Sequence, residues 1–302
     1  MTAHPFNPQL RAARFLPRTV ITARTLPALR VLTKLAAIAR RPDAQVVSVD
    51  ANVSVHVFRP ASTRPRSPAL LWIHGGGMVL GDAAQDSGFC RGVADQLNIV
   101  VVSVEYRLAP EHPFPAPLED CYTALQWLAR QPDIDPARIA IGGASAGGGL
   151  AAALALLTKE RGGIRPVLQL LSYPMLDDRT TTRTDIDPRS LRLWSPASNR
   201  FGWRAYLGPA VADGDGPPLA APARYADLSG LPPAWIGVGT NDLFHDEDVA
   251  YARRLQQAGV ATTLHVVPGA YHNFDSIEAK AAISRAFTKA QTTALDEALN
   301  GG

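Results

Sequence analysis

One serine in this sequence stands in a setting typical of a nucleophile. Ser145 is the centre of the segment GASAG, a G-x-S-x-G pattern that follows the apolar run RIAIG and precedes an Ala- and Leu-rich stretch. In this strand–turn–helix context a sharp turn lifts the serine hydroxyl clear of the sheet edge. Small neighbours let the backbone turn tightly, and the N-terminus of the following helix favours a developing oxyanion. The pattern predicts a nucleophile for acyl transfer.

Two other structures contain a similar turn. A dinucleotide-binding loop has a different glycine spacing, and an acidic ribose ligand about twenty residues further on. This chain has the segment GGIR there, at 162–165. The motif taken alone is also compatible with a helix that merely begins after a tight turn.

A run of three glycines offers the groups that stabilise an oxyanion. The apolar segment ALLWI leads directly into His74 and then into Gly75, Gly76 and Gly77. Glycines after a buried strand expose backbone N–H groups with no side chain in the way, as a preformed anion-binding loop requires. The N–H of Ala146, directly after the serine, would add a donor. We therefore expect the oxyanion hole at Gly75, Gly76, Gly77 and Ala146.

A serine nucleophile needs a histidine base, and His272 is the best candidate among the seven histidines. It lies in the loop PGAYHNF after the apolar run TTLHVV, and functional residues concentrate in such loops. His245 is the closest rival. His56 and His265 alternate with other residues inside expected strands, which favours a structural role for them.

The histidine in turn needs a carboxylate that fixes its tautomer, and Asp242 is placed for that role. It follows the apolar segment AWIGVGT at its carboxyl end. Asp246 and Asp248 fall in the first turn of the next helix, where helix-dipole and capping roles explain them. The chain order Ser145, Asp242, His272 is the order of α/β-hydrolases rather than that of chymotrypsin or subtilisin.

The elements that must position these residues alternate between strands and helices. Short apolar runs begin at residues 69, 99, 138, 167, 234 and 263 and are typical of strands buried on both faces of a largely parallel sheet. Two alternating segments within 46–58 predict two further strands. Helices are expected over 118–131, 146–161 and 246–258. The alternation predicts an α/β fold with helices on both faces of the sheet.

Residues 177–230 interrupt this alternation. They are rich in Pro, Gly, Arg and Asp and contain the large aromatics Trp194, Phe201, Trp203 and Tyr206. A structureless loop of this length is unusual in a compact domain. We expect an insertion with short helices that acts as a lid, with Phe201, Trp203 and Tyr206 folded over the site.

Composition excludes several classes of protein. The chain has 302 residues, 46% of them hydrophobic, which is enough for a large core and excludes wholesale disorder. Two cysteines, Cys90 and Cys121, are too few for a disulfide framework and fit a reducing compartment. The longest apolar run, 150–157, is far shorter than the ~20 residues of a membrane span. We expect a cytoplasmic protein.

The net charge of +3 conceals an uneven distribution. Residues 1–42 contain eight Arg or Lys and no acidic residue, whereas the rest of the chain has 22 basic and 27 acidic side chains. A targeting peptide, or an arm for nucleic acid or a membrane surface, has such a composition. The apolar spacing of Leu29, Leu32, Leu35 and Ile38 favours a local helix instead, which we expect to cover the substrate pocket.

Four segments together resemble the bacterial hormone-sensitive-lipase-like family of α/β-hydrolases. They are HGGG at 74–77, YRLAPE at 106–111 followed by HPFPA, GASAGG at 143–148, and DLFHDE at 242–247 with His272 downstream. The resemblance runs from about residue 45 to the end. It implies a single α/β-hydrolase domain over 1–302, with an eight-stranded, mostly parallel sheet. It also implies a helical cap formed by about 1–45 and about 178–225.

The resemblance implies a serine carboxylesterase that hydrolyses short- to medium-chain acyl esters through an acyl-enzyme, with no metal or organic cofactor. In the family pattern Gly76 and Gly77 donate to the oxyanion together with Ala146. Arg107 and Glu111 of YRLAPE are expected to pair with each other as a support element.

Two positions depart from the commonest family pattern. Ala144 stands where many members have Asp, so the nucleophile lacks a neighbouring carboxylate. Asn273 stands where Gly is usual after the histidine, and Asn tolerates a left-handed backbone better than most residues.

Other functions would use the same residues. An amidase or a lactonase needs the same triad, since the triad does not select the leaving group. A ligand receptor on this scaffold would lack catalysis, but all three triad residues are present, which favours the enzyme. The expected partner is a small-molecule ester, with no nucleic acid and no stable membrane insertion, and a homodimer is compatible with the sequence.

Overall fold

A single mixed sheet forms the centre of the computed structural model, which describes residues 5–40, 43–62, 65–208 and 216–301. Within these ranges eight strands pair in the order β1-β2-β4-β3-β5-β6-β7-β8. They are β1 (Gln45–Ser48), β2 (Ser54–Phe58), β3 (Ser67–Ile73), β4 (Val100–Glu105), β5 (Ile134–Ala144), β6 (Gln169–Ser172), β7 (Ala234–Asn241) and β8 (Thr262–Tyr271). β2 runs antiparallel to β1 and β4, and the remaining pairs are parallel. The predicted eight-stranded, mostly parallel sheet is confirmed.

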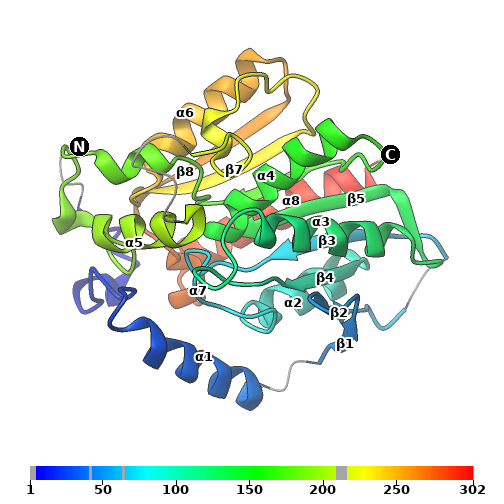
Figure 1. Cartoon of the computed structure of the whole chain (residues 1–302), viewed down its shortest axis with the longest axis horizontal. Helices are drawn as coiled ribbons and strands as arrows, with labels where there is room; N and C mark the ends of the chain where they lie inside the picture. Colours follow the sequence, from blue (N-terminus) through cyan, green and yellow to red (C-terminus); the bar gives the residue numbers. More distant parts are fainter. Residues whose placement is uncertain (1–4, 41–42, 63–64, 209–215, 302) are drawn as a thin grey trace.

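Helices cover both faces of this sheet (Figure 1). They are α1 (Leu26–Arg40), α2 (Ser87–Leu97), α3 (Ala116–Ala129), α4 (Ala146–Arg161), α5 (Pro196–Leu207), α6 (His245–Gln257), α7 (Phe274–Ile277) and α8 (Ala282–Asn300). Short 3-10 helices lie at η1 (Arg11–Arg14), η2 (Asp178–Thr182), η3 (Pro188–Ser190) and η4 (Pro222–Arg224). α2 and α8 pack on one face, and α3, α4 and α6 pack on the other, so the core has two halves with the sheet between them.

The central strands are buried along their whole length because helices cover both of their faces. Every residue of β3 is buried, and so are all residues of β6. The carboxyl ends of parallel strands meet at one edge of a sheet. The loops after β3, β5, β7 and β8 therefore bring Gly75, Ser145, Asp242 and His272 to the same place.

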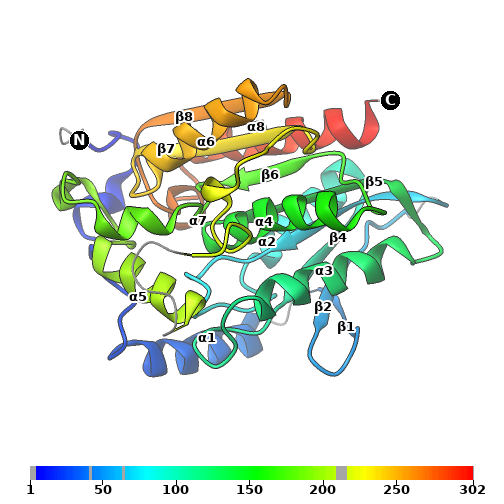
Figure 2. The same cartoon turned by 45° about the horizontal axis from the view of Figure 1, so that its top comes forward.

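The N-terminal segment packs against the insertion that follows β6. The Leu193 N–H donates to the Pro17 carbonyl at 2.9 Å, and the Ser198 hydroxyl donates to the Ile21 carbonyl at 2.8 Å. Figures 1 and 2 show α1 and α5 at the same end of the molecule. Residues 1–4, 41–42 and 209–215 of the two segments expected to form a cap lie outside the described residues.

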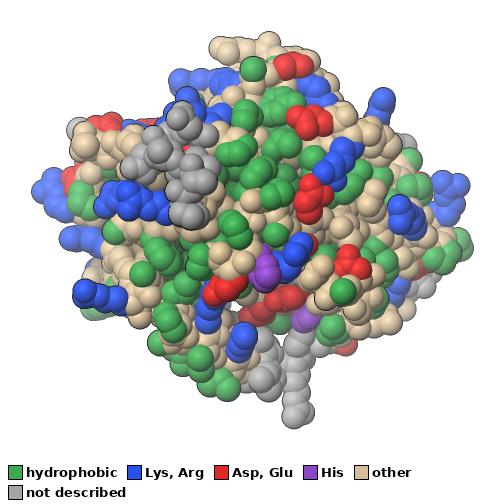
Figure 3. Space-filling model, viewed as in Figure 1, with side chains coloured by type: hydrophobic (Ala, Val, Ile, Leu, Met, Phe, Trp, Pro, Cys, Tyr) green, Lys and Arg blue, Asp and Glu red, His purple; other side chains and the backbone are tan. Residues whose placement is uncertain are grey.

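The outer side of α1 remains apolar. Val31, Leu32 and Leu35 are each more than half exposed. Figure 3 shows apolar side chains over the part of the surface where α1 lies. The expectation that the apolar side of this helix covers the substrate pocket is wrong for residues 26–36, because Leu32 and Leu35 face outward and none of these residues lines the cavity at Ser145.

The two thiols are interior groups. Cys90 in α2 and Cys121 in α3 are buried and free, and burial raises the pKa of each thiol well above its ordinary value. A buried, protonated thiol is chemically inert. Across the described ranges, none of the helices has the length and apolar character needed to span a membrane.

Candidate active site

Ser145 occupies a strained turn between β5 and α4. Its backbone has φ +58° and ψ −122°, a conformation that residues other than glycine rarely adopt. The turn is fixed on both sides, because the Ser145 N–H donates to the Ser172 carbonyl at 2.9 Å and its carbonyl accepts from the Met175 N–H at 3.0 Å. Helix α4 begins at the next residue, Ala146. Strain of this kind persists where the surrounding structure holds it, as at functional sites.

The two glycines of G-x-S-x-G are required by close backbone approach. A Cβ on Gly147 would collide with the carbonyls of Ile73 and His74 at the end of β3. A Cβ on Gly143 would collide with the backbone of Gly147. The first turn of α4 therefore rests directly against β3, which places Ser145 beside the glycine loop.

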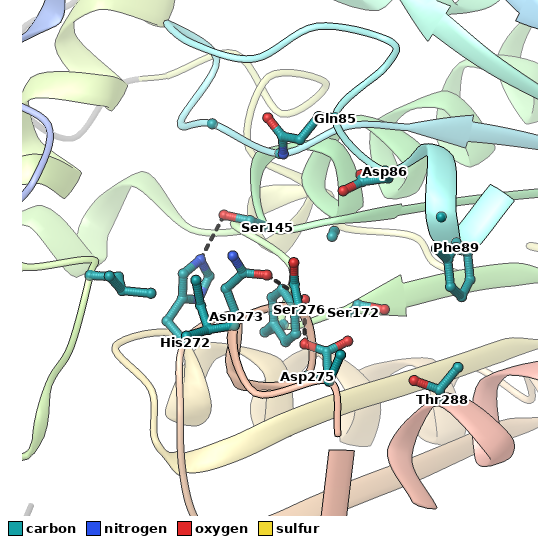
Figure 4. A pocket seen from close by; sticks show the side chains of 18 of the residues that line it. Gln85, Asp86, Phe89, Ser145, Ser172, His272, Asn273, Asp275, Ser276 and Thr288 are labelled. Atoms are coloured by element: carbon teal, nitrogen blue, oxygen red, sulfur yellow. Dashed lines mark hydrogen bonds between the residues drawn. The ribbon is translucent and has the colours of Figure 1, made fainter. Parts of the chain in front are cut away.

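Ser145, His272 and Asp242 form one chain of hydrogen bonds. His272 Nε2 lies 2.9 Å from Ser145 Oγ, and His272 Nδ1 lies 2.8 Å from Asp242 Oδ2 (Figure 4). Because a carboxylate only accepts, Nδ1 carries the proton and Nε2 accepts from the serine hydroxyl. Asp242 is fully buried, and its Oδ1 accepts from the Phe244 N–H at 3.0 Å. The arrangement can move a proton from Ser145 to His272.

Aromatic side chains fix the plane of the His272 ring. Tyr173 and Phe244 meet it edge-on, with ring centroids 5.0 and 5.3 Å away, and Trp194 lies at 6.4 Å. The following residue, Asn273, has φ +63°, the left-handed conformation expected of this position. The loop thus keeps its turn without glycine.

His245, the rival base, faces a different partner. Its Nδ1 lies 2.8 Å from Asp246 Oδ1, and Asp246 also pairs with Arg183 at 2.8 Å. His245 is therefore part of a surface ion-pair group, whereas His272 is bonded to Ser145.

The glycine loop lies against the serine with its backbone exposed. Gly75, Gly76 and Gly77 line the same cavity as Ser145. Gly76 and Gly77 have φ of +121° and +62°, and a Cβ on Gly77 would collide with the Trp194 ring. Only glycine readily adopts this backbone path. The loop can therefore bring its N–H groups within hydrogen-bonding distance of a bound carbonyl.

His74 holds this loop from behind. Burial lowers the pKa of its imidazole to about 4, so the ring is neutral at ordinary pH. Its Nδ1 donates to the Gly75 carbonyl at 2.8 Å. Tyr106 stacks on the ring at a centroid distance of 4.2 Å and donates its hydroxyl to the His74 carbonyl at 3.0 Å. His74 is a positioning residue that does not reach the cavity.

The cavity at Ser145 has a volume of about 890 Å³. Val20 and Ile21 of the N-terminal segment line it, together with Leu193 and Trp194 of the insertion. The prediction about the aromatics of the insertion was wrong in part. Phe201, Trp203 and Tyr206 do not line the cavity; Trp203 and Tyr206 are buried, and the Tyr206 ring meets Phe114 edge-on at a centroid distance of 5.8 Å.

The charged residues of YRLAPE do not pair with each other as expected. Arg107 instead binds Asp120 of α3 through a forked contact, with Nη2 2.6 Å from Oδ1. Glu111 binds Arg30 of α1, at 2.7 Å from Nη1. Arg30 also donates to the carbonyls of Val79 and Ala109 at 2.9 and 2.7 Å. The segment supports the site by anchoring α1 rather than through an internal ion pair.

The acidic residues that begin α6 are more buried than the capping explanation requires. Glu247 is buried and accepts from the backbone of Leu176 and Asp177 and from the Thr180 hydroxyl. Asp248 is fully buried, and neither of its carboxyl oxygens has a hydrogen-bond partner. Asp248 lies in the first turn of α6 as expected, but it accepts no backbone N–H and therefore does not cap the helix.

Sequence reasoning missed several residues of the cavity. Tyr173 follows β6, and Asp86 directly precedes α2, yet neither belongs to a motif that signals chemistry. Among the described residues, no group of three or more His, Cys, Asp or Glu could hold a metal ion.

Comparisons with known proteins agree on one family. A family model described as alpha/beta hydrolase fold matches residues 70–276. Carboxylesterase NlhH of Mycobacterium tuberculosis is 37% identical over 233 residues, which cover 74% of this chain and 71% of that protein. Among solved structures, a bacterial heroin esterase matches with a TM-score of 0.88 and 36% identity, covering 99% of this chain and all of that one. Esterase LipW from Mycobacterium marinum has a TM-score of 0.86 and 31% identity, with 99% and 100% coverage.

Proposed function

The chain belongs to the alpha/beta hydrolase fold family, in its hormone-sensitive-lipase-like branch, and is a carboxylic ester hydrolase. From this premise we propose that Ser145 is the nucleophile, His272 the general base and Asp242 the acid that orients it. The observation that carries the proposal is the continuous hydrogen-bonded chain from Ser145 Oγ to Asp242.

Hydrolysis proceeds in two acyl-transfer steps. His272 takes the proton of Ser145 as Oγ attacks the ester carbonyl, and Asp242 stabilises the imidazolium that forms. His272 then gives this proton to the leaving alcohol, which leaves an acyl-enzyme on Ser145. In the second step His272 takes a proton from water, the hydroxide attacks the acyl group, and Ser145 departs with its proton restored.

The oxyanion of each tetrahedral intermediate is held by backbone N–H groups. We assign this role to Gly76, Gly77 and Ala146, and Ala146 also places the positive end of the α4 dipole at the site. Gly75 contributes by its small size, since a Cβ there would lie 3.2 Å from the Cβ of Ser145. Loss of one such donor typically costs about 3 kcal/mol of transition-state stabilisation.

The substrates proposed are esters with short- to medium-chain acyl groups. A cavity of about 890 Å³ accepts such molecules, and Leu193, Trp194 and Ile21 supply apolar walls. We further propose that about 1–45 and about 178–225 act together as a cap, because these apolar walls come from those two segments.

The decisive experiment compares two histidines and one serine. With p-nitrophenyl butyrate, Ser145→Ala and His272→Ala should lower kcat by roughly a thousandfold or more. His245→Ala is the matched control and should keep most of the activity. A fluorescent phosphonate should label the wild-type protein covalently and should fail to label Ser145→Ala. The control Ser229→Ala should be labelled like the wild type. Near wild-type activity of Ser145→Ala would overturn the assignment.

We also propose a cytoplasmic location and a homodimer. The buried free thiols Cys90 and Cys121 suit a reducing compartment. β8 is an edge strand of the sheet and exposes Val266, and such an edge offers unpaired backbone groups to a second copy. Cell fractionation tests the first proposal. Light scattering tests the second, and a monomer at micromolar concentration would overturn it.

A further inference from the structure

The cavity at Ser145 extends away from the apolar walls into a second region, which we call the polar arm. It is bounded by residues of α2, of the segment after His272, and of α8. In Figure 4, Gln85 and Asp86 lie on one side of it, Asp275 on the other, and Thr288 at its far end. Carboxylate and amide side chains line the arm beside apolar ones, so it can hold a polar or charged group.

Asp275 faces the polar arm without a basic partner. Its Oδ1 accepts a hydrogen bond of 2.8 Å from the Tyr173 hydroxyl, a neutral donor. No ion pair of the described residues includes it. Burial raises the pKa of this carboxyl to about 6, and the charge of Asp86 raises it further in the same direction. Two carboxylates facing one cavity repel each other, which a bound cation would relieve.

Asp86 brings an aromatic wall with it. Its Oδ2 accepts from Trp72 Nε1 at 2.8 Å, and the Trp72 ring packs against Phe89 with centroids 4.5 Å apart. All three residues line the cavity. Aromatic rings beside carboxylates attract organic cations through the negative face of the ring.

Gln291 adds an acceptor that lacks a donor. Its side chain is 98% buried and lines the polar arm. Its Nε2 donates to Ser172 Oγ at 2.6 Å, while its Oε1 has no partner. This oxygen is enclosed by the protein, so it acts on a ligand in the arm through its negative partial charge rather than by direct contact, and it favours a positively charged group there.

The basic residues of the arm lie at its outer end. Arg285 and Lys289 of α8 line the cavity but are exposed, and Arg285 donates to the Lys280 carbonyl. Exposed charges are screened by solvent, whereas half-buried carboxylates act on a ligand more strongly. The charge that a substrate meets beside Ser145 is therefore negative.

We propose that the polar arm binds an ammonium group of the ester substrate, held between Asp275 and Asp86. Ser145 thus acts preferentially on esters that carry a positively charged amine within a few bonds of the ester group. This inference rests on the proposed role of Ser145 and specifies the substrate class. Asp275, Asp86 and Gln291 are specificity-determining residues that take no part in proton transfer.

The test compares substrates that differ only in charge. The first pair carries the charge in the alcohol group and consists of acetylcholine and its carbon isostere 3,3-dimethylbutyl acetate. The second pair carries it in the acyl group and consists of p-nitrophenyl trimethylammonioacetate and p-nitrophenyl 3,3-dimethylbutanoate. The measured quantity is the ratio of kcat/KM for the charged ester to kcat/KM for its neutral isostere, and any general loss of activity cancels in this ratio.

Variants separate the arm from the triad. Asp275→Asn should lower the ratio roughly tenfold for one of the two pairs, the size expected for one charge-assisted contact, and Asp86→Asn should lower the same ratio. Asp296→Asn is the matched control, because Asp296 is exposed on α8 and does not line the cavity. Its ratio should stay at the wild-type value.

The wild-type protein gives a second readout that needs no variant. The trimethylammonium charge does not titrate, so the ratio should rise as Asp275 loses its proton between about pH 5 and 7. Groups that face the same cavity are Asp86, Tyr173, His272, Arg285 and Lys289. His272 acts equally on the charged ester and on its neutral isostere, so its effect on kcat/KM cancels in the ratio. Asp275→Asn should flatten the profile.

Each outcome has one meaning. Hydrolysis of the neutral esters with ratios that Asp275→Asn and Asp86→Asn leave unchanged would overturn this inference and leave the proposed esterase untouched. A preference of the wild-type protein for a p-nitrophenyl hemisuccinate over its neutral methyl ester would assign the arm to anions and would also overturn it. Absence of hydrolysis for every ester, with no phosphonate labelling of Ser145, would instead overturn the proposed function.

Discussion

Two glycines in this molecule differ in how much space surrounds them. Gly77 has φ +62° and the Trp194 ring directly over its Cα, so the loop path and the indole exclude any side chain there. Gly92 lies inside α2 with open space around it. The path of the glycine loop therefore requires Gly77, whereas no contact requires a glycine at position 92.

Gly77→Ala should therefore damage the reaction more than the fold. The added methyl group displaces Trp194 or the loop, and we expect kcat for p-nitrophenyl butyrate to fall at least tenfold. Gly92→Ala is the matched control and should leave kcat unchanged while raising stability by roughly 0.5–1 kcal/mol. Steady-state kinetics and thermal unfolding check both. Wild-type kcat in Gly77→Ala would show that this N–H is not a donor.

Asp248 should make the protein less stable as pH rises. Burial raises the pKa of its carboxyl well above the ordinary value, and the charges of Glu247 and Asp242 act in the same direction. Above about pH 4 the unfolded chain has lost this proton while the folded chain keeps it. Unfolding then releases a proton, and the free energy of unfolding falls by about 1.4 kcal/mol per pH unit until the folded group also ionises.

Asp248→Asn removes this contribution. Urea unfolding at pH 5, 6, 7 and 8 should give a shallower decline of the free energy of unfolding than in the wild type. Asp296→Asn, a change at an exposed carboxylate, should keep the wild-type slope. Equal slopes for Asp248→Asn and wild type would contradict the assignment of a buried, protonated Asp248.

At the scale of elements, the connection between α1 and the glycine loop depends on one side chain. Arg30 bonds Glu111 and the carbonyls of Val79 and Ala109, and Val79 lies two residues after Gly77. These contacts join the first helix to the loop after β3. The outer face of α1 is exposed, so few other contacts replace them.

Replacement of Arg30 by Met should loosen α1 selectively. Three contacts of a charged donor are lost, and we expect amide exchange in 26–36 to accelerate at least tenfold while exchange in β3 stays unchanged. Arg24→Met is the control, because Arg24 is exposed just before α1. Mass spectrometry of deuterium uptake measures both. Equal uptake in the two variants would assign the stability of α1 to packing alone.

The strand and helix pattern of the core was predictable because burial on both sheet faces leaves long apolar runs. α4 begins and ends where its composition indicated, at Ala146 and Arg161. The positions of Ser145, Asp242 and His272 followed from the strand ends in front of them, since parallel strands place their carboxyl ends together.

Partners of side chains were not predictable in the same way. Arg107 and Glu111 are four residues apart, yet they bind different helices. Arg107 pairs with Asp120 of α3, and Glu111 pairs with Arg30 of α1. Trp194 lines the cavity, whereas Trp203 of α5 is buried beside Tyr206 and does not line it. Such choices depend on how elements meet, which local sequence does not encode.

For the whole molecule, the uneven charge distribution has a structural counterpart. The basic, acid-free N-terminal segment contributes Val20 and Ile21 to the wall of the cavity at Ser145. Hydrogen bonds of four described residue pairs join it to the insertion: Leu193 to Pro17, Arg192 to Ala13, Thr19 to Ser195 and Ser198 to Ile21. These contacts support the proposed role of the segment as part of the cap.

Removal of residues 1–40 should thus change catalysis as well as stability. Loss of Val20 and Ile21 opens the apolar side of the cavity, so KM for p-nitrophenyl butyrate should rise more than kcat falls. The melting temperature should also drop, because the partners of the lost segment become exposed.

Ser198→Ala separates the two effects of that truncation. It removes the hydrogen bond to the Ile21 carbonyl and the weaker one that Ser198 accepts from Ser195 within the insertion. KM should shift in the same direction by a smaller factor, since the cavity wall stays present but less firmly held. Kinetics over acyl chains of two to eight carbons measures the change. If the truncated protein kept wild-type KM values across the series, the basic segment would be a targeting or docking arm, and its arginines would act outside the catalytic domain.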